Sequence, residues 1–464
     1  MAKFNYILLG FAELGFFFVE IIIRLYLLKY YTDEIKLDPK LAGIAISISL
    51  LWDAISDPLM GYISDHFPLV IRTKNQVWKK KRVFYMILGS LFTSLFFIVL
   101  FLDFIKERSQ VEKFFYLLVN YFFLNTFLTI MSVPHSALCS EASINPNDRN
   151  WIFGFRLIWG NIGLILGILL PTYFSLNQEG VIKNILFAAV ILISVWVSSL
   201  VGFQLDTHEK TFTPKSYFFD VFRTTKFLLK NQYLFVLVLS YFIAFVGIGI
   251  NSAIALFYYE YTLKFSEQET SLILLVFLLV WTFSVPVWIW LAKRFEKKHL
   301  ILLAIFSLGL GTVLGYPNFP ERDLIYPLIA SVVGGILAAS IVLMDTLIAD
   351  LTNYDFVKLR FREKRDGLFF GFLKMIIKVS RAVSILISSF ALGFIGFHEN
   401  PLSFEVSRNI SYIFGYGVGF FLILSSLVFL SFDYDSKKHE KVIRIIQTYQ
   451  KLKEAPQNLS KSIV

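Results

Sequence analysis

Cysteine is almost absent from this 464-residue chain, and charged residues are scarce. The single cysteine, Cys139, excludes an internal disulfide framework and a cysteine metal cluster. Charged residues make up 17% of the chain, hydrophobic residues make up 56%, and the mean hydropathy is +0.65. A water-soluble protein of this length needs polar surfaces around two or three domains, so we exclude that class. The sequence also lacks phosphate-binding glycine loops, metal-spaced histidines and serine-hydrolase motifs, so we expect neither an enzyme nor a cofactor.

The hydrophobic residues fall in long blocks. The runs 41–63, 83–102 and 233–259 are long enough to cross the roughly 30 Å hydrocarbon core of a bilayer as helices. Lipid offers no partner to an unpaired backbone amide, and the runs are too apolar for an outer-membrane barrel. The sequence therefore predicts an all-α membrane protein with twelve spans, at about 4–32, 41–65, 82–104, 113–139, 153–175, 182–204, 233–260, 268–291, 299–316, 325–349, 367–396 and 409–432.

The longest connection between the predicted spans divides them six and six. We predict an N-terminal six-helix bundle over residues 1–204, a central loop over 205–232, a C-terminal six-helix bundle over 233–432 and a tail over 433–464. Helical spacing of apolar residues in the tail predicts an amphipathic helix on the membrane face or on the bundle, with a frayed tail as the alternative. The 6+6 plan is typical of transporters that bind their substrate between two bundles.

Basic residues predict the orientation in the membrane. One set of loops, taken with both termini, carries roughly three times as many Lys and Arg residues as the other set. The positive-inside rule then places both termini in the cytoplasm, and we expect a plasma membrane, specifically a bacterial inner membrane. The cluster Lys79–Arg82 is either such a topology signal or a site for anionic lipid. Topology also explains the net charge of +10, so we expect no nucleic-acid partner.

Two aspartates in the second span are the first candidates for chemistry. Asp53 and Asp57 are four residues apart, so both carboxylates project from one helix face. Two buried like charges need compensation by a bound cation, by protonation or by a facing lysine or arginine. The neighbouring Pro58 can free a backbone carbonyl oxygen for a hard cation. The pattern indicates a monovalent cation site, with a fixed ion pair between the bundles as the alternative.

The first span carries a polar stripe of its own. Glu13, Glu20 and Arg24 are spaced seven and four residues apart and share one helix face. Glu20 and Arg24 either pair with each other or offer Glu20 to a substrate. In the fourth span, His135 follows Pro134, and we expect a buried neutral histidine, with proton coupling as the alternative.

The eleventh span carries a cationic stripe. Lys374, Lys378 and Arg381 share one face of that helix. This stripe suits a charge network that changes partners between two states of a transporter, and it can also attract an anionic substrate. Lys374 and Arg381 can alternatively extend toward a membrane interface, so Lys378 is the main candidate.

Two motifs far apart in the chain resemble one known family. The run Trp52–Gly61, WDAISDPLMG, resembles the second-helix signature of the glycoside–pentoside–hexuronide:cation symporters, which include the melibiose carrier. The runs Ala349–Asp355 and Lys364–Gly371 resemble that family's loop between spans ten and eleven, and Lys378 resembles its helix-eleven lysine. The resemblance implies the major facilitator fold and cation-driven symport by alternating access.

The same resemblance implies a set of cation ligands. Asp53 and Asp57 match the family's cation-binding aspartates, and Thr129 matches a threonine that adds an oxygen ligand. Ser56 stands where the melibiose carrier has an asparagine. Oxygen ligands suit Na⁺ or Li⁺, and two carboxyls can equally carry H⁺, so the sequence does not choose the coupling ion.

The family's sugar-binding acids are missing from this chain. The melibiose carrier holds its sugar with one acidic residue on helix one and another on helix four, and these positions are Phe17 and Ser132 here. A galactoside substrate is therefore not supported. Arg156, which matches a family arginine, and Lys378 remain as substrate-binding candidates beside Glu20, Arg24 and Ser132.

A third resemblance concerns gating. Gly61 and Asp65, followed by basic residues, resemble the facilitator motif after helix two, in which the aspartate can pair with a basic residue or cap a helix across the bundle seam. Asp350 and Arg365, in the loop motif between spans ten and eleven, are further gating candidates.

Three functions remain possible from the sequence. The first is Na⁺- or H⁺-coupled symport of a sugar, glycoside or uronide. The second is transport of a lysophospholipid or another amphipathic anion, for which the run Phe16–Phe18 would suit an acyl chain. The third is a membrane sensor without transport, against which the paired aspartates argue. We expect a monomer in a lipid bilayer that binds one small solute and a monovalent cation.

Overall fold

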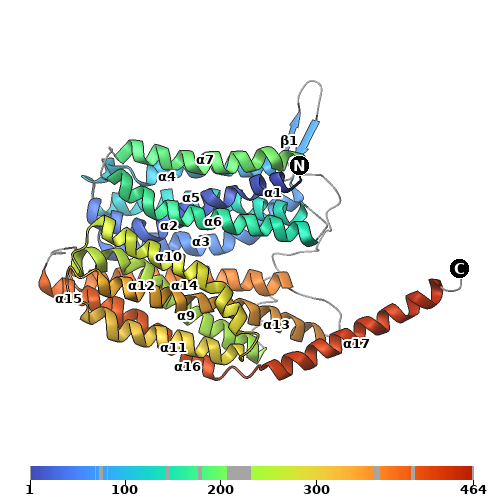
Figure 1. Ribbon diagram of the computed structural model, residues 1–464. Coiled ribbons are helices and arrows are strands. Elements are labelled where there is room, and N and C mark those ends of the chain that lie inside the picture. Colours follow the sequence, from blue (N-terminus) through green and yellow to red (C-terminus); the bar gives the residue numbers. More distant parts are fainter. Residues whose placement is uncertain are drawn as a thin grey trace.

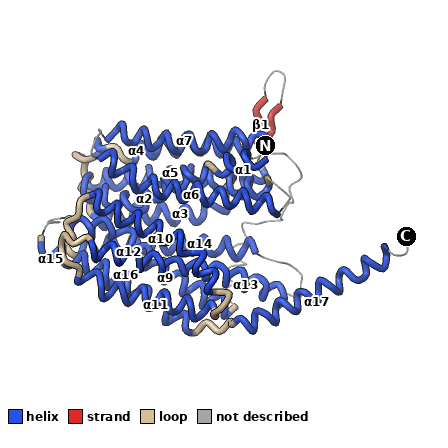
Figure 2. The backbone as a smooth tube through the Cα atoms, in the orientation of Figure 1, coloured by secondary structure: helices blue, strands red, loops and turns tan. Residues whose placement is uncertain are grey.

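The protein is almost entirely helical (Figure 1, Figure 2). The computed structural model describes residues 2–67, 69–72, 77–80, 82–142, 146–175, 180–205, 231–358, 366–398 and 403–461. Within these residues, twelve helical stretches are long and apolar enough to cross a membrane, which confirms the predicted number. They are Phe4–Glu34, Pro39–Gly61, Val83–Leu100, Gln110–Ser140, Trp151–Phe174, Val181–Phe203, Gln232–Thr262, Glu267–Leu291, Lys297–Asn318, Ile325–Lys358, Gly371–Phe394 and Phe404–Leu430.

The first six spans form one bundle, drawn in blue to green in Figure 1. The first span is broken at Phe11, whereas α3 begins cleanly because the side chain of Asp38 accepts hydrogen bonds from the first backbone amides. The elements of this bundle are α1 (Ala2–Gly10), α2 (Ala12–Lys29), η1 (Tyr30–Glu34), α3 (Pro39–His66), α4 (Val83–Leu100), η2 (Asp103–Ile105), α5 (Gln110–Glu141), α6 (Pro146–Ser175) and α7 (Gly180–Leu205).

The last six spans form the second bundle, drawn in yellow-green to red. Its elements are α9 (Gln232–Phe257), η3 (Tyr258–Thr262), α10 (Glu267–Leu291), α11 (Lys297–Gly315), η4 (Tyr316–Asn318), α12 (Ile325–Ala338), η5 (Ala339–Ile341), α13 (Val342–Lys358), α14 (Asp366–Phe394), α15 (Phe404–Tyr412), η6 (Ile413–Gly417) and α16 (Val418–Leu430).

The first span of each bundle repeats that of the other at an offset of 228 residues. The first and seventh spans both end in a π-helical turn, η1 and η3, followed by a lysine with a positive φ of 59°, Lys36 or Lys264. Side chains at this offset also meet: Arg24 Nε donates to Ser252 Oγ at 3.0 Å, and Tyr261 Oη donates to Asp33 Oδ2 at 2.7 Å, each pair 228 residues apart. Positions that contact their own counterparts lie on a two-fold axis, which here runs between α2 and α9.

The bundles are held together at the end opposite the chain termini, which we call the closed end. There Lys29 Nζ lies 2.7 Å from Glu260 Oε2, and the hydroxyls of Thr172 and Ser271 lie 2.5 Å apart. Figure 1 shows both termini at the other end, toward which the bundles diverge. Between described residues, the hydrogen bonds and ion pairs that join the bundles lie at the closed end or near the middle of the spans.

Among the described residues, one helix and one hairpin lie outside the bundles. The predicted tail helix is present as α17 (Ser436–Lys461). An antiparallel hairpin of β1 (Leu69–Arg72) and β2 (Val77–Lys80) was not predicted; it lies in the basic loop after α3. The last residue of the basic cluster, Arg82, is buried and donates from Nη1 to Ser64 Oγ at 2.7 Å. Most of the predicted central loop, residues 206–230, lies outside the described residues.

Candidate functional site

Asp53 and Asp57 of α3 meet Lys378 of α14 across the boundary between the bundles. Lys378 Nζ lies 2.9 Å from Asp53 Oδ2 and also contacts Asp57 Oδ2. The side chains of Asp53, Asp57 and Lys378 are 13%, 30% and 22% exposed, so the group is only partly desolvated. One ammonium group facing two carboxylates leaves the trio with a net charge of −1 when all three are ionised, one positive charge short of neutrality.

Thr129 of α5 completes this cluster on the side away from Lys378. Its Oγ1 lies 2.8 Å from Asp53 Oδ1 and 2.9 Å from Asp57 Oδ1, and the Ser56 hydroxyl lies 3.3 Å from it. A hydroxyl carries one hydrogen, so Thr129 can donate to only one of the two carboxylates at a time. The predicted oxygen ligands therefore converge, and they have fewer donors than acceptors. A monovalent cation or a proton would supply the missing positive charge.

Neighbouring contacts set the rotation of α3 that brings these groups together. Trp52 Nε1 donates to Thr126 Oγ1 at 2.9 Å, and its ring stacks on Phe122 with centroids 4.9 Å apart, which fixes α3 against α5. On the other side, Ser47 Oγ donates to the Ala382 carbonyl oxygen at 2.9 Å, which fixes α3 against α14. The aspartates thus point into the seam between α5 and α14.

A second charged layer lies nearby in the same interface. Arg381 Nη2 of α14 donates to Glu20 Oε1 of α2 at 2.5 Å. Arg24 donates to Ser252 rather than to Glu20. Glu20 and Arg24 therefore do not pair with each other, and each has its partner in the C-terminal bundle. Glu20 and Arg381 are 39% and 28% exposed. Arg381 was not predicted as a partner; the signal was that an acid inside the membrane needs a counter-charge.

Arg156 of α6 is engaged inside the N-terminal bundle. Its Nε donates to Glu13 Oε1 at 2.6 Å and its Nη2 donates to Ser136 Oγ at 3.0 Å. Glu13 is buried and lies on the polar stripe of the first span, yet its pairing with Arg156 was not predicted. Ser132, another substrate candidate, is half-buried one turn from Ser136.

The phenylalanines of the first span mostly serve packing. Phe18 is fully buried with its ring 5.4 Å from that of Phe187, and Phe16 is buried 5.3 Å from the His135 ring. The expectation that the whole run lines an acyl-chain path is therefore wrong for these two residues. Phe17 is half-buried and lies against Gly160, where an added Cβ would be 3.0 Å from its ring.

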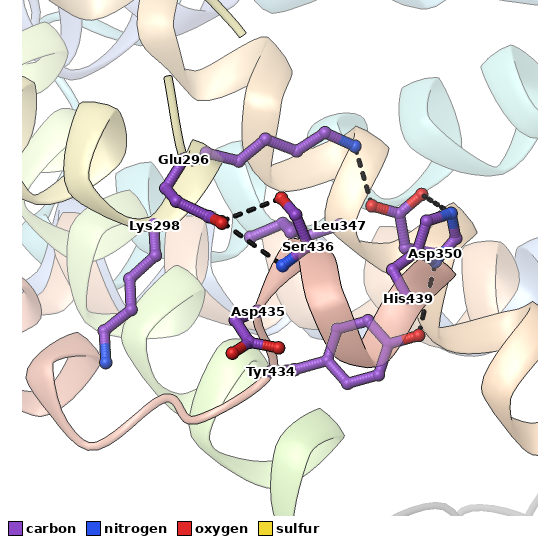
Figure 3. A pocket seen from close by; sticks show the side chains of 9 residues that line it. Glu296, Lys298, Leu347, Asp350, Tyr434, Asp435, Ser436 and His439 are labelled. Atoms are coloured by element: carbon purple, nitrogen blue, oxygen red, sulfur yellow. Dashed lines mark hydrogen bonds and ion pairs between the residues drawn. The ribbon is translucent and has the colours of Figure 1, made fainter. Parts of the chain in front are cut away.

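The gating candidates have different surroundings. Gly61 faces Val133 of α5. Asp350 lies within one bundle, in the pocket of Figure 3, where Lys297 Nζ is 2.6 Å from Oδ2 and His439 Nε2 is 3.5 Å from Oδ1. The side chain of Asp65 and the whole of Arg365 lie outside the part of the chain that the structure describes.

The pocket around Asp350 is where α17 meets the C-terminal bundle. Glu296, before α11, accepts hydrogen bonds from the Ser436 hydroxyl at 2.8 Å and from the Ser436 amide at 3.3 Å (Figure 3). Burial raises the pKa of Tyr434, so its hydroxyl stays protonated and can donate to His439 Nδ1 at 3.2 Å. These contacts attach the start of the tail helix to the bundle.

Comparison with known proteins identifies relatives that cover most of the chain. The profile of the family described as "MFS/sugar transport protein" matches residues 8–436. The sodium-dependent lysophosphatidylcholine symporter 1 of Mus musculus is 24% identical over 94% of this chain and 85% of its own length. The protein of the same name from Gallus gallus is 25% identical over 94% and 86%. The uncharacterized symporter YjmB of Bacillus subtilis (strain 168) is 22% identical over 85% and 83%.

Solved structures support the fold. The crystal structure of the nucleoside transporter NupG superimposes with a TM-score of 0.65 and 16% sequence identity, over 93% of this chain and 100% of that chain. At this identity the likeness concerns the arrangement of helices. It agrees with the predicted two-bundle membrane fold.

Proposed function

The chain belongs to the MFS/sugar transport protein family, which makes it an integral membrane secondary transporter, and we propose that it is a sodium-coupled symporter of a lysophospholipid or a related amphipathic anion. The observation that carries the proposal is the convergence of two carboxylates and a threonine hydroxyl on one spot beside a single lysine.

The charge balance of that cluster supports cation coupling. Asp53 and Asp57 carry one negative charge more than Lys378 neutralises, and a second cation removes the deficit without a second basic side chain. Hard cations prefer oxygen ligands, and Asp53, Asp57 and Thr129 supply three, with Ser56 close by. The sodium dependence named for the curated relatives favours Na⁺, and H⁺ is the second candidate.

In the proposed mechanism the ion and Lys378 share the two aspartates. Sodium arrival shifts the carboxylates away from the lysine, and the freed ammonium group can meet the headgroup of the substrate. By linkage, substrate then raises sodium affinity by the same factor as sodium raises substrate affinity. Both ligands cross as the bundles rock about the axis between α2 and α9, and no nucleotide is needed.

Two observations support an amphipathic substrate over a sugar. The curated relatives that cover most of the chain include lysophosphatidylcholine symporters. The positions at which the melibiose carrier places its sugar-binding acids are Phe17, which lies against Gly160, and the uncharged Ser132. A sugar, glycoside or uronide is the second candidate, because the family profile is described as a sugar transport family. A membrane sensor without transport remains the weakest of the three.

Other proposals concern the setting of the protein. We propose a monomer in a bacterial inner membrane, with both termini in the cytoplasm, because most Lys and Arg residues between the predicted spans belong to the set of loops that shares a side with the termini. The structure then corresponds to a state closed toward the outside. The domain limits given above stay predictions, and so do two sets of residue roles. The substrate-facing roles concern Glu20, Arg24, Ser132, Arg156 and Lys378, and the gating roles concern Gly61, Asp65, Asp350 and Arg365.

The test is uptake by the full-length protein in liposomes. We expect an inward sodium gradient to drive uptake of labelled lysophosphatidylcholine, and Asp53→Asn and Asp57→Asn each to reduce this uptake at least tenfold. Asp345→Asn is the matched control, because Asp345 is an acid of α13 that accepts a hydrogen bond from Tyr241, inside one bundle.

Parallel arms separate the alternatives. Uptake of melibiose or a glucuronide, but not of the lysolipid, would move the proposal to the second substrate class. Uptake driven by a pH gradient alone would make H⁺ the coupling ion. If both aspartate variants transport at the wild-type rate, the cation site is wrong.

A further inference from the structure

His135 lies in a buried cluster that the cation mechanism does not use. The histidine is fully buried on α5, six residues from Thr129, which is about 9 Å along a helix. The ring of His135 is close to the Leu9 carbonyl of α1 and to Glu13 and Phe16 of α2. Arg156 of α6 does not contact the ring itself but pairs with Glu13. On α5 itself, Cys139 Sγ lies 3.4 Å from His135 Nε2.

The break in the first span determines the state of one ring nitrogen. Because α1 ends at Gly10, the Leu9 carbonyl oxygen is free to accept hydrogen bonds from outside its helix. Ser198 Oγ of α7 donates to it at 2.6 Å, and His135 Nε2 lies 2.9 Å from it. A carbonyl oxygen can only accept, so Nε2 carries a hydrogen.

The other ring nitrogen also faces an acceptor. Nδ1 of His135 lies 3.5 Å from Glu13 Oε1 and has no hydrogen-bond partner among the described residues. Arg156 holds Glu13 through two nitrogens, which keeps the carboxyl ionised. With its only proton on Nε2, the ring would point a lone pair at a carboxylate oxygen in a buried place, which is unfavourable. A second proton on Nδ1 turns this contact into an ion pair.

Two opposing effects keep that second proton exchangeable. Glu13 attracts it, whereas Arg156, which shares the same carboxylate oxygen, and the burial of the ring both oppose it. We propose that His135 and Glu13 form a proton-binding site in the N-terminal bundle, separate from the Asp53–Asp57 cluster, and that its proton competes with Arg156 for Glu13. Proton binding then loosens the hold of Glu13 on Arg156, whose side chain is 15% exposed and available to an anionic headgroup.

The test reads the ring directly and needs no substrate. We would label the histidines of the full-length protein with ¹⁵N and follow their NMR signals from about pH 5 to about pH 9, the range around histidine titration. The His135 signal is identified by its loss in His135→Gln, a substitution whose amide can still donate to Leu9. We expect this ring to change between one and two protons within the range.

Substitutions of the neighbouring charged residues test whether Glu13 and Arg156 control the proton on His135. Glu13→Gln is expected to move the midpoint of the His135 transition down by about one pH unit or more, and Arg156→Gln to move it up. Asp57→Asn should leave it in place, because that residue belongs to the other cluster. If Glu13→Gln fails to fold, Arg156→Gln alone carries the test. The proposal is overturned if the His135 ring keeps the same number of protons, one or two, throughout the range. It is also overturned if the midpoint is the same in Arg156→Gln as in the wild type.

Discussion

At the scale of single residues, Lys378 decides how the aspartate pair behaves. Its ammonium group reaches both carboxylates, and the fixed ion pair that we weighed against a cation site would use this same contact. The two interpretations differ in what happens when the lysine is removed. A structural ion pair simply loses its partner, whereas a cation site should let sodium take the vacated place.

We therefore expect Lys378→Met to make the protein more dependent on sodium. Without sodium, the variant should lose about 2 kcal/mol of stability, between the values for exposed and buried pairs. With sodium, the rise in melting temperature should be larger than in the wild type. The measurement is thermal unfolding of purified protein in sodium chloride and in choline chloride.

Lys374→Met is the control for this comparison. Lys374 lies one turn from Lys378 on the same helix and is exposed. It should show the wild-type response to sodium. A Lys378→Met protein whose melting temperature rises no more than that of the wild type would favour the fixed ion pair.

The sequence predicted the members of the cation cluster better than the pairing of the other charges. The four-residue spacing of Asp53 and Asp57 places both on one helix face in any rotation of that helix, and the structure brings Thr129 and Lys378 to them. Glu13 and Glu20 share a stripe just as clearly. However, their partners Arg156 and Arg381 depend on how α2 is rotated against α6 and α14, which spacing within one helix does not determine.

At the scale of elements, helix length and polarity explain which parts were predicted. The twelve spans follow from apolar runs that must cross a fixed thickness, and all twelve are present. The break between α1 and α2 could not be predicted because no proline marks it in the sequence. The Leu9 carbonyl oxygen at the break accepts its hydrogen bonds from α5 and α7, which are distant in the sequence. The β1–β2 hairpin was not predicted because it lies in a strongly basic loop, whose charges we interpreted only as a topology signal or a lipid site.

The contact between α3 and α14 offers a test of how the closed end is held. A Cβ added at Gly43 would lie 2.3 Å from Ser389 Cβ, and this atom cannot move aside by side-chain rotation. Gly43→Ala should therefore push the two bundles apart at the closed end. Spin labels at Glu107 and Glu405, which are exposed, should report a longer distance than in the wild type.

Gly154→Ala is the matched control for this substitution. A Cβ at Gly154, on α6, would meet nothing within 4 Å, so the same change in helix propensity occurs without a clash. Cys139 is buried and does not compete for the label. Equal label distances in the two variants would mean that α3 and α14 do not hold this end shut.

At the scale of the whole molecule, the two-fold repeat concentrates its contacts on the axis. Arg24 meets Ser252 and Asp33 meets Tyr261, so equivalent positions of the two bundles face each other along α2 and α9. Lys29 adds a charged contact at the same level, with Asp33 at 2.9 Å and Glu260 at 2.7 Å. A rocking motion about this axis has to break the contacts at one end while those near the middle can remain.

The Tyr261 hydroxyl should accordingly bias the balance between the two states. Tyr261→Phe removes the hydrogen bond to Asp33 Oδ2 while keeping the ring, which costs the closed end about 1 kcal/mol, or about a fivefold change in population. The long-distance population of the Glu107–Glu405 label pair should grow by that factor. Tyr412→Phe, on an exposed ring of α15, should leave it unchanged. If the two tyrosine variants give the same distance distribution, packing alone holds the closed end. The polar contacts on the axis would then not affect the balance between the two states.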